Sequence, residues 1–534
     1  MSVTPPTGES RASRLAITLS DRAGRLIVTV DEWLRRPWAL VAVLVAASAP
    51  ILFLNAFRFA LPVGYAGLYS MMAELLARTG PGFPSLVPYY GQGGAPFAYP
   101  PLGIILMALA ERLSGVSALT YTRIAPPILG VAAVIALFWL AREITRSSVA
   151  AFVAGVILAT SGRNYLFHIE AAGVVRGLGL VFALLCALAL LRTLRQPSAK
   201  WFVLTSLLFA LTVLTHLVYA LFLLVGTPCL ALAVPRPRSF VLALGAVLVG
   251  TGMALPWLGW VVQHFGWSAL VSAAQTHGNA GTLQLLHDPA RVLLPRMEDS
   301  LRNLLRDSKL AGLVVTGIVF AVAGLHFEVP LWMAGVIALI PEGDRFITVL
   351  AGILSGAVVG VLFRELRRTE DGRPPRPSQR VRGWALVAVL SVIFYRTGLQ
   401  SISALQPSIS IDTLDLATFV RSSTPDGATF LAVASPDEAE WLPFLFHRQT
   451  MISPWGAEWK GTYTEEQERA AEVVRCASDQ SVACLDRLMG SLPEQPDLLI
   501  THGQQEEINA ALKSSGDWTP AFTNDAYVLW VRVP

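Results

Sequence analysis

The sequence predicts an α-helical membrane protein of many spans, followed by a small α/β domain. Apolar residues make up 54% of the 534 positions and charged residues 15%, against about 45–50% and 25% in soluble proteins. Mean hydropathy is +0.54. Charge is divided along the chain, because residues 397–534 carry 19 acidic and 8 basic side chains whereas the rest carries 18 and 33. This composition excludes both a disordered chain and a string of soluble domains.

The first segment, residues 1–37, is predicted to be a basic amphipathic helix on the cytoplasmic leaflet. Its apolar residues recur at helical spacing, and it carries six arginines, which anionic headgroups attract. These are Arg11, Arg14, Arg22, Arg25, Arg35 and Arg36. The apolar run that follows is too long and too far from the N-terminus for an ordinary cleaved signal peptide.

The membrane domain, residues 38–396, follows from the positive-inside rule, which places short basic loops in the cytoplasm. The strongest basic cluster holds seven arginines between 364 and 382. An even number of spans must separate consecutive clusters, which gives eleven. They lie near 38–57, 124–141, 148–161, 173–191, 201–215, 217–234, 240–262, 310–325, 329–341, 346–363 and 383–396. The apolar segment 101–113 is shorter than the roughly 20 residues that a span needs, so we expect an interfacial helix there.

This topology puts every long loop on the outer face, including a large first loop, 58–123, and the acidic tail, 397–534. The tail contains strand-like stretches at 428–433, 497–502 and 526–533, rich in β-branched and aromatic residues. Helix-like stretches lie at 464–475 and 481–490. We therefore expect an extracytoplasmic α/β domain at residues 397–534, and we expect any chemistry to be extracytoplasmic.

The first outer loop supports a family resemblance. It combines an amphipathic helix at 64–80 (GYAGLYSMMAELLARTG), an aromatic, Gly-rich turn at 88–103 (PYYGQGGAPFAYPPLG) and a short juxtamembrane helix. This arrangement resembles the GT-C superfamily of integral membrane glycosyltransferases. The YPPLG stretch is similar to protein O-mannosyltransferases, and the turn before it is similar to bacterial proteins with the 6-pyruvoyl-tetrahydropterin-synthase-related membrane domain.

The resemblance continues to about residue 191 and returns at 341–346 (PEGDRF), about a third of the chain. It implies transfer of a sugar from a polyprenyl-phosphate carrier to a glycan or protein acceptor outside the membrane. The sequence departs from the family where an Asp usually precedes a Tyr-x-x-x-Ala pattern. The pattern here is Tyr69 to Ala73, and the acid position holds Tyr65.

Glycosyl transfer to a hydroxyl needs a carboxylate that takes the proton or orients the nucleophile. Glu74 in the first loop is one candidate, with a solvated helix face as the alternative. In the short loop 161–177, Glu170 is a candidate base or metal ligand, with His168 beside it. Arg163 and Arg176 in the same loop could bind a lipid phosphate. The alternative for this loop is a set of salt bridges that anchors two helix ends.

Further binding residues are predicted in other segments. Arg345 at the start of a span could reach the carrier phosphate or pair with Asp344. Aromatic faces beside a few polar groups suit sugar rings, and the candidates for acceptor binding are Tyr89, Tyr90, Gln92, Trp441, Trp455 and Trp459. The alternative is that the tail tryptophans pack the tail onto the membrane domain.

Two cysteines of the tail, Cys476 and Cys484, flank a seven-residue link between two helix-like stretches. Because the tail is expected outside, where conditions are oxidising, we predict a disulfide between them. The other two cysteines lie in apolar runs and are expected to pack.

The sequence therefore predicts a multi-pass glycosyltransferase of the cell membrane in a bacterium, with a cytoplasmic N-terminus. A divalent cation, Mg²⁺ or Mn²⁺, is compatible with this function, although no ligand spacing specifies it. The alternative is a catalytically silent GT-C-like protein that binds a lipid-linked glycan or serves as a scaffold subunit, which Tyr65 favours. A transporter fits the span count but lacks internal repeats. Nucleic-acid binding is excluded, because the basic residues follow the cytoplasmic leaflet and the exposed domain is acidic.

Overall fold

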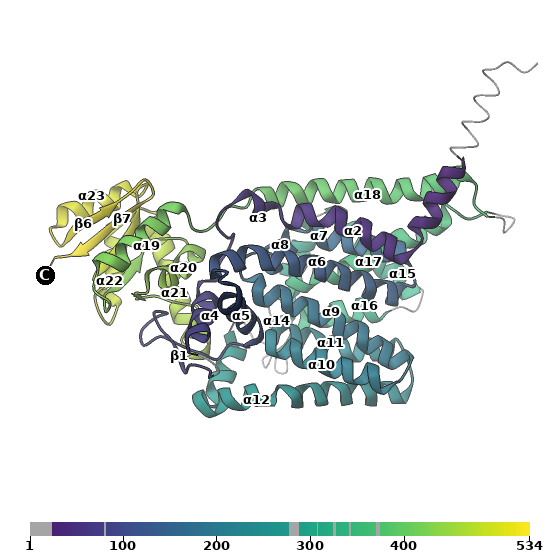
Figure 1. The fold of residues 1–534 in the computed structure, drawn as a ribbon, viewed down its shortest axis with the longest axis horizontal. Helices are drawn as coiled ribbons and strands as arrows, with labels where there is room; N and C mark the ends of the chain where they lie inside the picture. Colours follow the sequence, from purple (N-terminus) through teal and green to yellow (C-terminus); the bar gives the residue numbers. More distant parts are fainter. Residues whose placement is uncertain are drawn as a thin grey trace, which may run out of the picture.

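A computed structural model describes residues 24–79, 82–276, 288–306, 308–323, 327–340, 343–369 and 374–533. Figure 1 shows a bundle of long helices with a smaller domain at one end, where the C-terminus lies. The bundle elements are α2 (Pro37–Leu52), α3 (Leu54–Arg58), α6 (Ala118–Thr145), α7 (Ser148–Thr160), α8 (Gly162–His168), α9 (Gly173–Arg195), α10 (Ala199–Thr215), α11 (Leu217–Leu232), α12 (Pro237–Gln275), α14 (Pro289–Arg306), α15 (Ser308–Ala323), α16 (Glu328–Leu339), α17 (Asp344–Glu365) and α18 (Pro377–Ser403).

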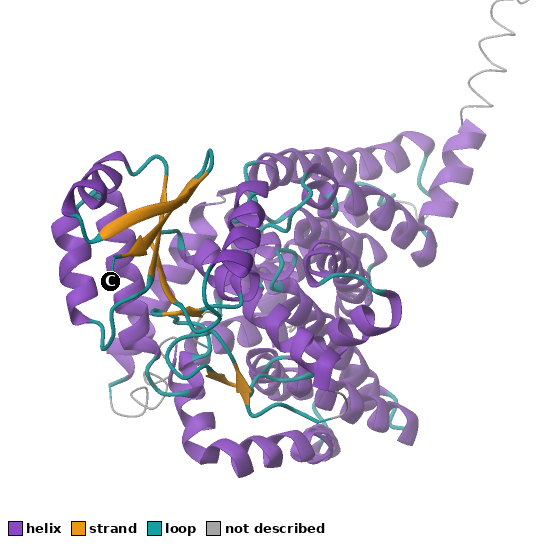
Figure 2. Cartoon of the chain, turned by 60° about the vertical axis from the view of Figure 1, so that its left-hand side comes forward, coloured by secondary structure: helices purple, strands orange, loops and turns teal. Residues whose placement is uncertain are grey.

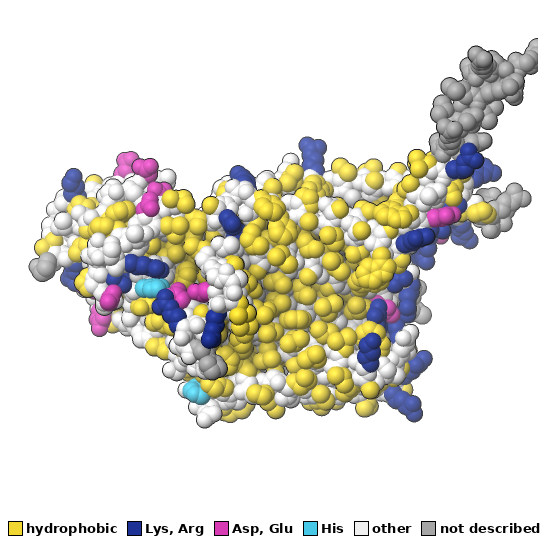
Figure 3. All heavy atoms as spheres, viewed as in Figure 1, with side chains coloured by type: hydrophobic (Ala, Val, Ile, Leu, Met, Phe, Trp, Pro, Cys, Tyr) yellow, Lys and Arg dark blue, Asp and Glu magenta, His cyan; other side chains and the backbone are white. Residues whose placement is uncertain are grey.

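A helix lies over each of the eleven predicted spans. By length and composition, five described helices could cross a membrane, and seven could if two bent helix pairs each count as one span. Figure 3 shows hydrophobic side chains over the middle of the bundle and Lys and Arg gathered at the end far from the C-terminal domain. The chain is a multi-pass membrane protein. The count of eleven remains a prediction.

Small residues let the bundle helices approach closely. The helix α17 packs along α7, and a Cβ at Gly356 would overlap the backbone carbonyl of Ala150. At Gly352 an added Cβ would lie 3.2 Å from the carbonyl oxygen of Ala154, which is a tight contact without overlap. Such small-residue contacts replace hydrophobic burial as the main packing device between membrane helices.

The basic end of the bundle is held by one buried carboxylate. Asp31, on the helix Gly24–Leu34, is 1% exposed. It accepts two hydrogen bonds from Arg367, at 2.5 and 2.8 Å, and others from Arg380 and from the indole of Trp384. This helix makes an angle of 89° with α2. Because Asp31 binds Arg367, the described part of the N-terminal segment is joined to the arginine-rich loop. Arg11, Arg14 and Arg22 lie outside the described residues.

The first outer loop connects the bundle to the C-terminal domain. It contains α4 (Gly67–Thr79), β1 (Leu86–Val87), β2 (Ala95–Pro96) and α5 (Leu102–Ser114), so both predicted helices are present. The following helix, α6, begins at Ala118 rather than near 124, because the Ser117 hydroxyl caps its first turn. At the other boundary α18 continues to Ser403, past 396, where Ile402 is fully buried and its carbonyl accepts a hydrogen bond from Asn55.

The C-terminal domain is a five-stranded sheet in the order β4-β3-β5-β7-β6, with β3 parallel to β4 and β5 and the other pairs antiparallel. Figure 2 shows these strands with helices on both sides. The elements are α19 (Ile411–Ser423), β3 (Thr429–Ala432), α20 (Pro436–Phe446), β4 (Gln449–Thr450), η2 (Ala457–Trp459), α21 (Tyr463–Ser478), α22 (Val482–Ser491), β5 (Leu498–His502), α23 (Glu506–Ser515), β6 (Trp518–Thr523) and β7 (Tyr527–Arg532).

Alternate residues of the central strands face different helices, as strand geometry requires. Phe430 and Leu498 pack with α19, α20 and the first outer loop, whereas Leu431 and Leu499 pack with α21, α22 and α23. The three predicted strands and two predicted helices are all present. Cys476 and Cys484 form a disulfide with a Cα–Cα distance of 5.4 Å, joining the end of α21 to the start of α22.

Candidate functional site

A cavity of about 900 Å³ lies between the C-terminal domain and the ends of the bundle helices that face it. One wall of the cavity is apolar and is formed by residues of α11 and α16. Its other walls are aromatic and charged. The lining includes Tyr65, Tyr69, Tyr99, Phe167, Arg176, His216, Leu217, Val218, Leu221, Arg296, Asp299, Ile337, Ile340, Asp344, Arg345, Asp437, Trp455, Glu458, Trp459 and Tyr463.

Two arginines at the starts of helices give this cavity a positive region. Arg176 lies in the first turn of α9, and Arg345 is the second residue of α17. The Arg345 guanidinium lies 5.2 Å from the centre of the Phe167 ring, and that of Arg176 lies 5.0 Å from the Tyr65 ring. Arg176 also donates a hydrogen bond to the Tyr65 hydroxyl. Since helix N-termini also favour negative charge, this region is suited to an anion.

The third predicted arginine, Arg163, supports this region without lining the cavity. Its helix, α8, turns by 68° from α7 after the break at Ser161. Arg163 forms an ion pair with Asp344, the neighbour of Arg345, and its guanidinium lies 5.6 Å from the Phe167 ring. Arg163 is therefore placed to hold the start of α17 rather than to meet a ligand.

The predicted base, Glu170, is close to the cavity but does not line it. It packs against Gly64, where an added Cβ would lie 2.9 Å from the Cβ of Glu170. Burial and the neighbouring Asp437 raise the pKa of Glu170 to about 8, although Arg176 opposes the shift. His168 is 1% exposed, packs edge-on to Tyr219 and does not line the cavity either.

The other predicted base, Glu74, lies in a different place. It lines a separate cavity of about 420 Å³ with Arg78, Glu111 and Arg421. It forms an ion pair with Arg78, and His447 Nε2 lies 3.6 Å from its carboxylate. The two predicted carboxylates, Glu74 and Glu170, therefore do not converge with Arg345 on one cavity.

The predicted acceptor residues divide into two groups. Trp455 and Trp459 line the main cavity. Tyr90 and Trp441 are 1% and 0% exposed and lie where the C-terminal domain meets the first outer loop. Their side chains therefore pack the two parts together and do not face the cavity. The ring of Tyr89 stacks on His447 at 5.7 Å, and the backbone carbonyl of Gln92 accepts a hydrogen bond from Lys460.

This docking interface is built from hydrogen bonds between segments more than 300 residues apart. The Glu440 carboxylate accepts from the backbone N–H groups of Gly67, at 2.5 Å, and Leu68, at 2.7 Å, at the start of α4. The Trp441 indole donates to the Gly64 carbonyl at 2.8 Å, and the Tyr90 hydroxyl donates to the Glu440 carbonyl at 2.9 Å. The interface places α20 and η2 against the cavity.

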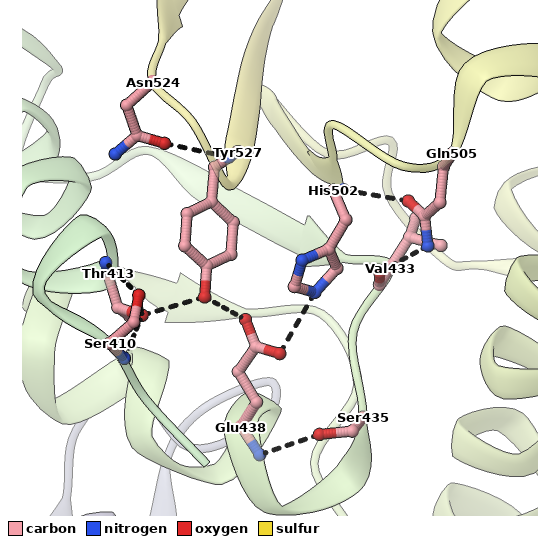
Figure 4. Close-up of polar contacts among 9 residues, drawn as sticks. All are labelled: Ser410, Thr413, Val433, Ser435, Glu438, His502, Gln505, Asn524 and Tyr527. Atoms are coloured by element: carbon pink, nitrogen blue, oxygen red, sulfur yellow. Dashed lines mark hydrogen bonds and ion pairs between the residues drawn. The ribbon is translucent and has the colours of Figure 1, made fainter. Parts of the chain in front are cut away.

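A second polar network fixes α20 from its other side (Figure 4). The Glu438 carboxylate accepts a hydrogen bond from Tyr527 at 2.7 Å and pairs with His502 at 3.1 Å. The Tyr527 hydroxyl also lies 2.8 Å from that of Thr413. This hydrogen bonding to Glu438 raises the pKa of His502. Glu438 is the neighbour of Asp437, so the network helps to position a carboxylate of the cavity wall.

Sequence reasoning missed Asp437 and Glu458 as candidates. Glu458 stands beside Trp455 and Trp459 in the segment 440–459, whose tryptophans were predicted to bind the acceptor, whereas Asp437 precedes that segment. Burial raises the pKa of Asp437, against the effect of Arg176, and burial raises the pKa of Glu458 to about 7. No local pattern marks either residue, since their place in the cavity depends on the docking of the whole domain.

The residues present do not fit a divalent cation. Within the described ranges, no three or more His, Cys, Asp or Glu side chains come together in a way that could hold a metal ion. Glu170 and Asp437 interact, but the nearby Arg176 already supplies positive charge.

Known structures share this architecture. The apo oligosaccharyltransferase of Archaeoglobus fulgidus matches with a TM-score of 0.61 at 14% identity, covering 88% of this chain and 70% of that one. ArnT from Cupriavidus metallidurans matches with a TM-score of 0.52 at 14% identity, covering 92% and 98%. The chain has the GT-C fold. No protein-family model and no curated protein matches the sequence.

The cavity of this chain lies at the junction of the helix bundle and the C-terminal domain. A third solved structure, the archaeal oligosaccharyltransferase AglB of A. fulgidus in complex with an inhibitory peptide and a dolichol-phosphate, has a TM-score of 0.61 at 14% identity and covers 89% of this chain and 70% of that one. At this identity the likeness establishes the fold alone, since one fold hosts many different chemistries.

Proposed function

We propose that this chain transfers a sugar from a polyprenyl-phosphate carrier to an acceptor on the outer face of the cell membrane. The observation that supports it best is the pairing, in one cavity, of two arginines with an apolar wall. Arg176 and Arg345 offer bidentate donors to a phosphate. Leu217, Leu221 and Ile337 line the side formed by membrane helices, where a polyprenyl chain would lie.

The acceptor would enter from the C-terminal domain. Trp455, Trp459 and Tyr99 present aromatic surface to the cavity, and aromatic faces suit the C–H faces of sugar rings. The complex of AglB with a dolichol-phosphate supports a lipid-phosphate ligand in a protein of this fold. The acidic C-terminal domain would lie outside, because the arginine-rich loop 364–382 is expected in the cytoplasm.

The test uses the full chain in lipid nanodiscs. Undecaprenyl phosphate should raise its thermal stability, and radiolabelled polyprenyl-phosphate pentoses and hexoses should donate label to a glycan fraction from bacterial envelopes. Arg345→Ala and Arg176→Ala should each weaken undecaprenyl-phosphate binding by about 10–100-fold, that is, by the 1.5–3 kcal/mol of hydrogen bonds to a charged group.

Arg112→Ala is the matched control, since Arg112 is exposed on α5, and it should bind as the unmodified chain does. Binding of undecaprenyl phosphate without transfer of any sugar would favour a catalytically silent protein that binds lipid-linked glycans. Equal binding by the Arg345, Arg176 and Arg112 variants would contradict the phosphate site.

A further inference from the structure

Four carboxylates line the main cavity among the described residues: Asp299, Asp344, Asp437 and Glu458. Asp344 forms an ion pair with Arg163. Burial raises the pKa of Asp437, and the positive charge of the nearby Arg176 opposes that rise. Asp299 is exposed on the amphipathic helix α14. Three of the four are thus engaged with arginines or open to solvent, and Glu458 differs from them.

Glu458 lies in η2, the single turn between Trp455 and α21. The turn is fixed by Gly456, whose φ of 87° suits glycine and which packs tightly against Ala95 of the first outer loop. Within the described residues, no cationic side chain forms a salt bridge with Glu458, and its Oε2 is buried without a hydrogen-bond partner. Backbone hydrogen bonds at Gly456 and Glu458 steady the carboxylate.

The next residue carries the complementary group. Trp459 also lines the cavity and is 6% exposed, and its indole Nε1 is a buried donor without a hydrogen-bond partner in the part of the chain that the structure describes. A buried acceptor and a buried donor on adjacent residues each cost free energy when unmade. One hydroxyl group could satisfy both, since it donates one hydrogen bond and accepts others.

We propose that Glu458 and Trp459 bind the hydroxyl of the acceptor that becomes glycosylated, and that Glu458 is the catalytic base. This rests on the proposed function. The base then comes from the C-terminal domain, whereas the corresponding first-loop position near the cavity holds Tyr65. Tyr65 faces Arg176 instead and helps to orient that guanidinium.

The acceptor oxygen forms a bond to the anomeric carbon of the sugar, and the bond from that carbon to the phosphate oxygen breaks. The bonding pair leaves with the phosphate, whose charge Arg176 and Arg345 stabilise. The hydroxyl proton passes to the Glu458 carboxylate. Burial of Glu458, which raises its pKa to about 7, suits a group that must both take and release a proton near neutral pH.

The experiment compares Glu458→Gln with Glu468→Gln, a matched control on the exposed face of α21. Transfer from the active polyprenyl-phosphate sugar is measured with separate kcat and KM values, together with undecaprenyl-phosphate binding and thermal stability. Glu458→Gln should lower kcat by 10²–10⁴-fold, with donor KM and undecaprenyl-phosphate binding within twofold of the control. Glu458→Asp should keep part of the activity.

Exogenous formate should restore measurable transfer to Glu458→Ala and not to Arg176→Ala, because a small acid can replace a missing base but not a missing phosphate ligand. The assignment is overturned if Glu458→Gln keeps more than a tenth of the control kcat. It is also overturned if Glu458→Gln and Glu458→Asp both have a lower thermal stability but an unchanged kcat. In that case the Arg176 and Arg345 results still decide the proposed function. If the unmodified chain neither binds undecaprenyl phosphate nor transfers sugar, the proposed function fails first.

Discussion

Replacing Glu440 by alanine should detach the C-terminal domain from the first outer loop. The Glu440 side chain is 1% exposed, and its two oxygens accept hydrogen bonds from consecutive N–H groups at the start of α4. Alanine leaves Gly67 and Leu68 with buried donors and no acceptor. At about 1–3 kcal/mol for each unsatisfied group, the docked state should lose roughly 2–6 kcal/mol.

Two other variants serve as comparisons for Glu440→Ala. Glu440→Gln keeps one carbonyl oxygen as an acceptor and should lose about half as much. Glu468→Ala removes an exposed carboxylate of the same domain and should change stability by less than about 0.5 kcal/mol. The loss in Glu440→Ala corresponds to a fall of roughly 5–15 °C in the Tm of the domain.

The assay is thermal unfolding in nanodiscs combined with limited trypsin digestion. Undocking should expose the segment after α18 and speed release of the C-terminal domain, and sugar transfer should fall because η2 no longer closes the cavity. Undecaprenyl-phosphate binding should fall much less, since Arg176 and Arg345 belong to the bundle. A Tm and a digestion rate equal to those of Glu468→Ala would refute this reasoning.

Glu458, the Cys476–Cys484 disulfide and His502 each give a further measurable expectation. Transfer should rise with pH through about 7 and then level off, because Glu458 acts when ionised; a pH–rate profile without this limb contradicts its role as base. Reduction of the Cys476–Cys484 disulfide should destabilise the C-terminal domain by about 2–3 kcal/mol, and a Cys484→Ala variant should show the same Tm with and without reductant. The raised pKa of His502 means that its pairing with Glu438 adds stability fully below about pH 6.5 and loses it as pH rises through the folded pKa; thermal unfolding of His502→Asn should therefore depend less on pH between 6 and 8.

The sequence determined the features that depend on neighbouring residues. Apolar runs and arginine clusters predicted the helices, because hydropathy and charge act over a single segment. The strands of the C-terminal domain were predictable for the same reason, since their β-branched and aromatic residues are contiguous. The predicted pairing of Cys476 and Cys484 rested on a short link between two helices and on the arginine-rich loop that puts the tail outside, and both are features of neighbouring residues.

Tertiary structure decided the site. Glu170 was predicted from its arginine neighbours, yet packing against Gly64 keeps it out of the cavity lining. Trp441 looked like a sugar-binding residue, but its ring is buried and its indole bonds to the first outer loop. Glu458 reaches the cavity because hydrogen bonds between segments far apart in sequence, such as those of Glu440 to the start of α4, dock the domain. No local pattern encodes such contacts, since their free energy arises from groups that meet only after the bundle and the sheet have formed.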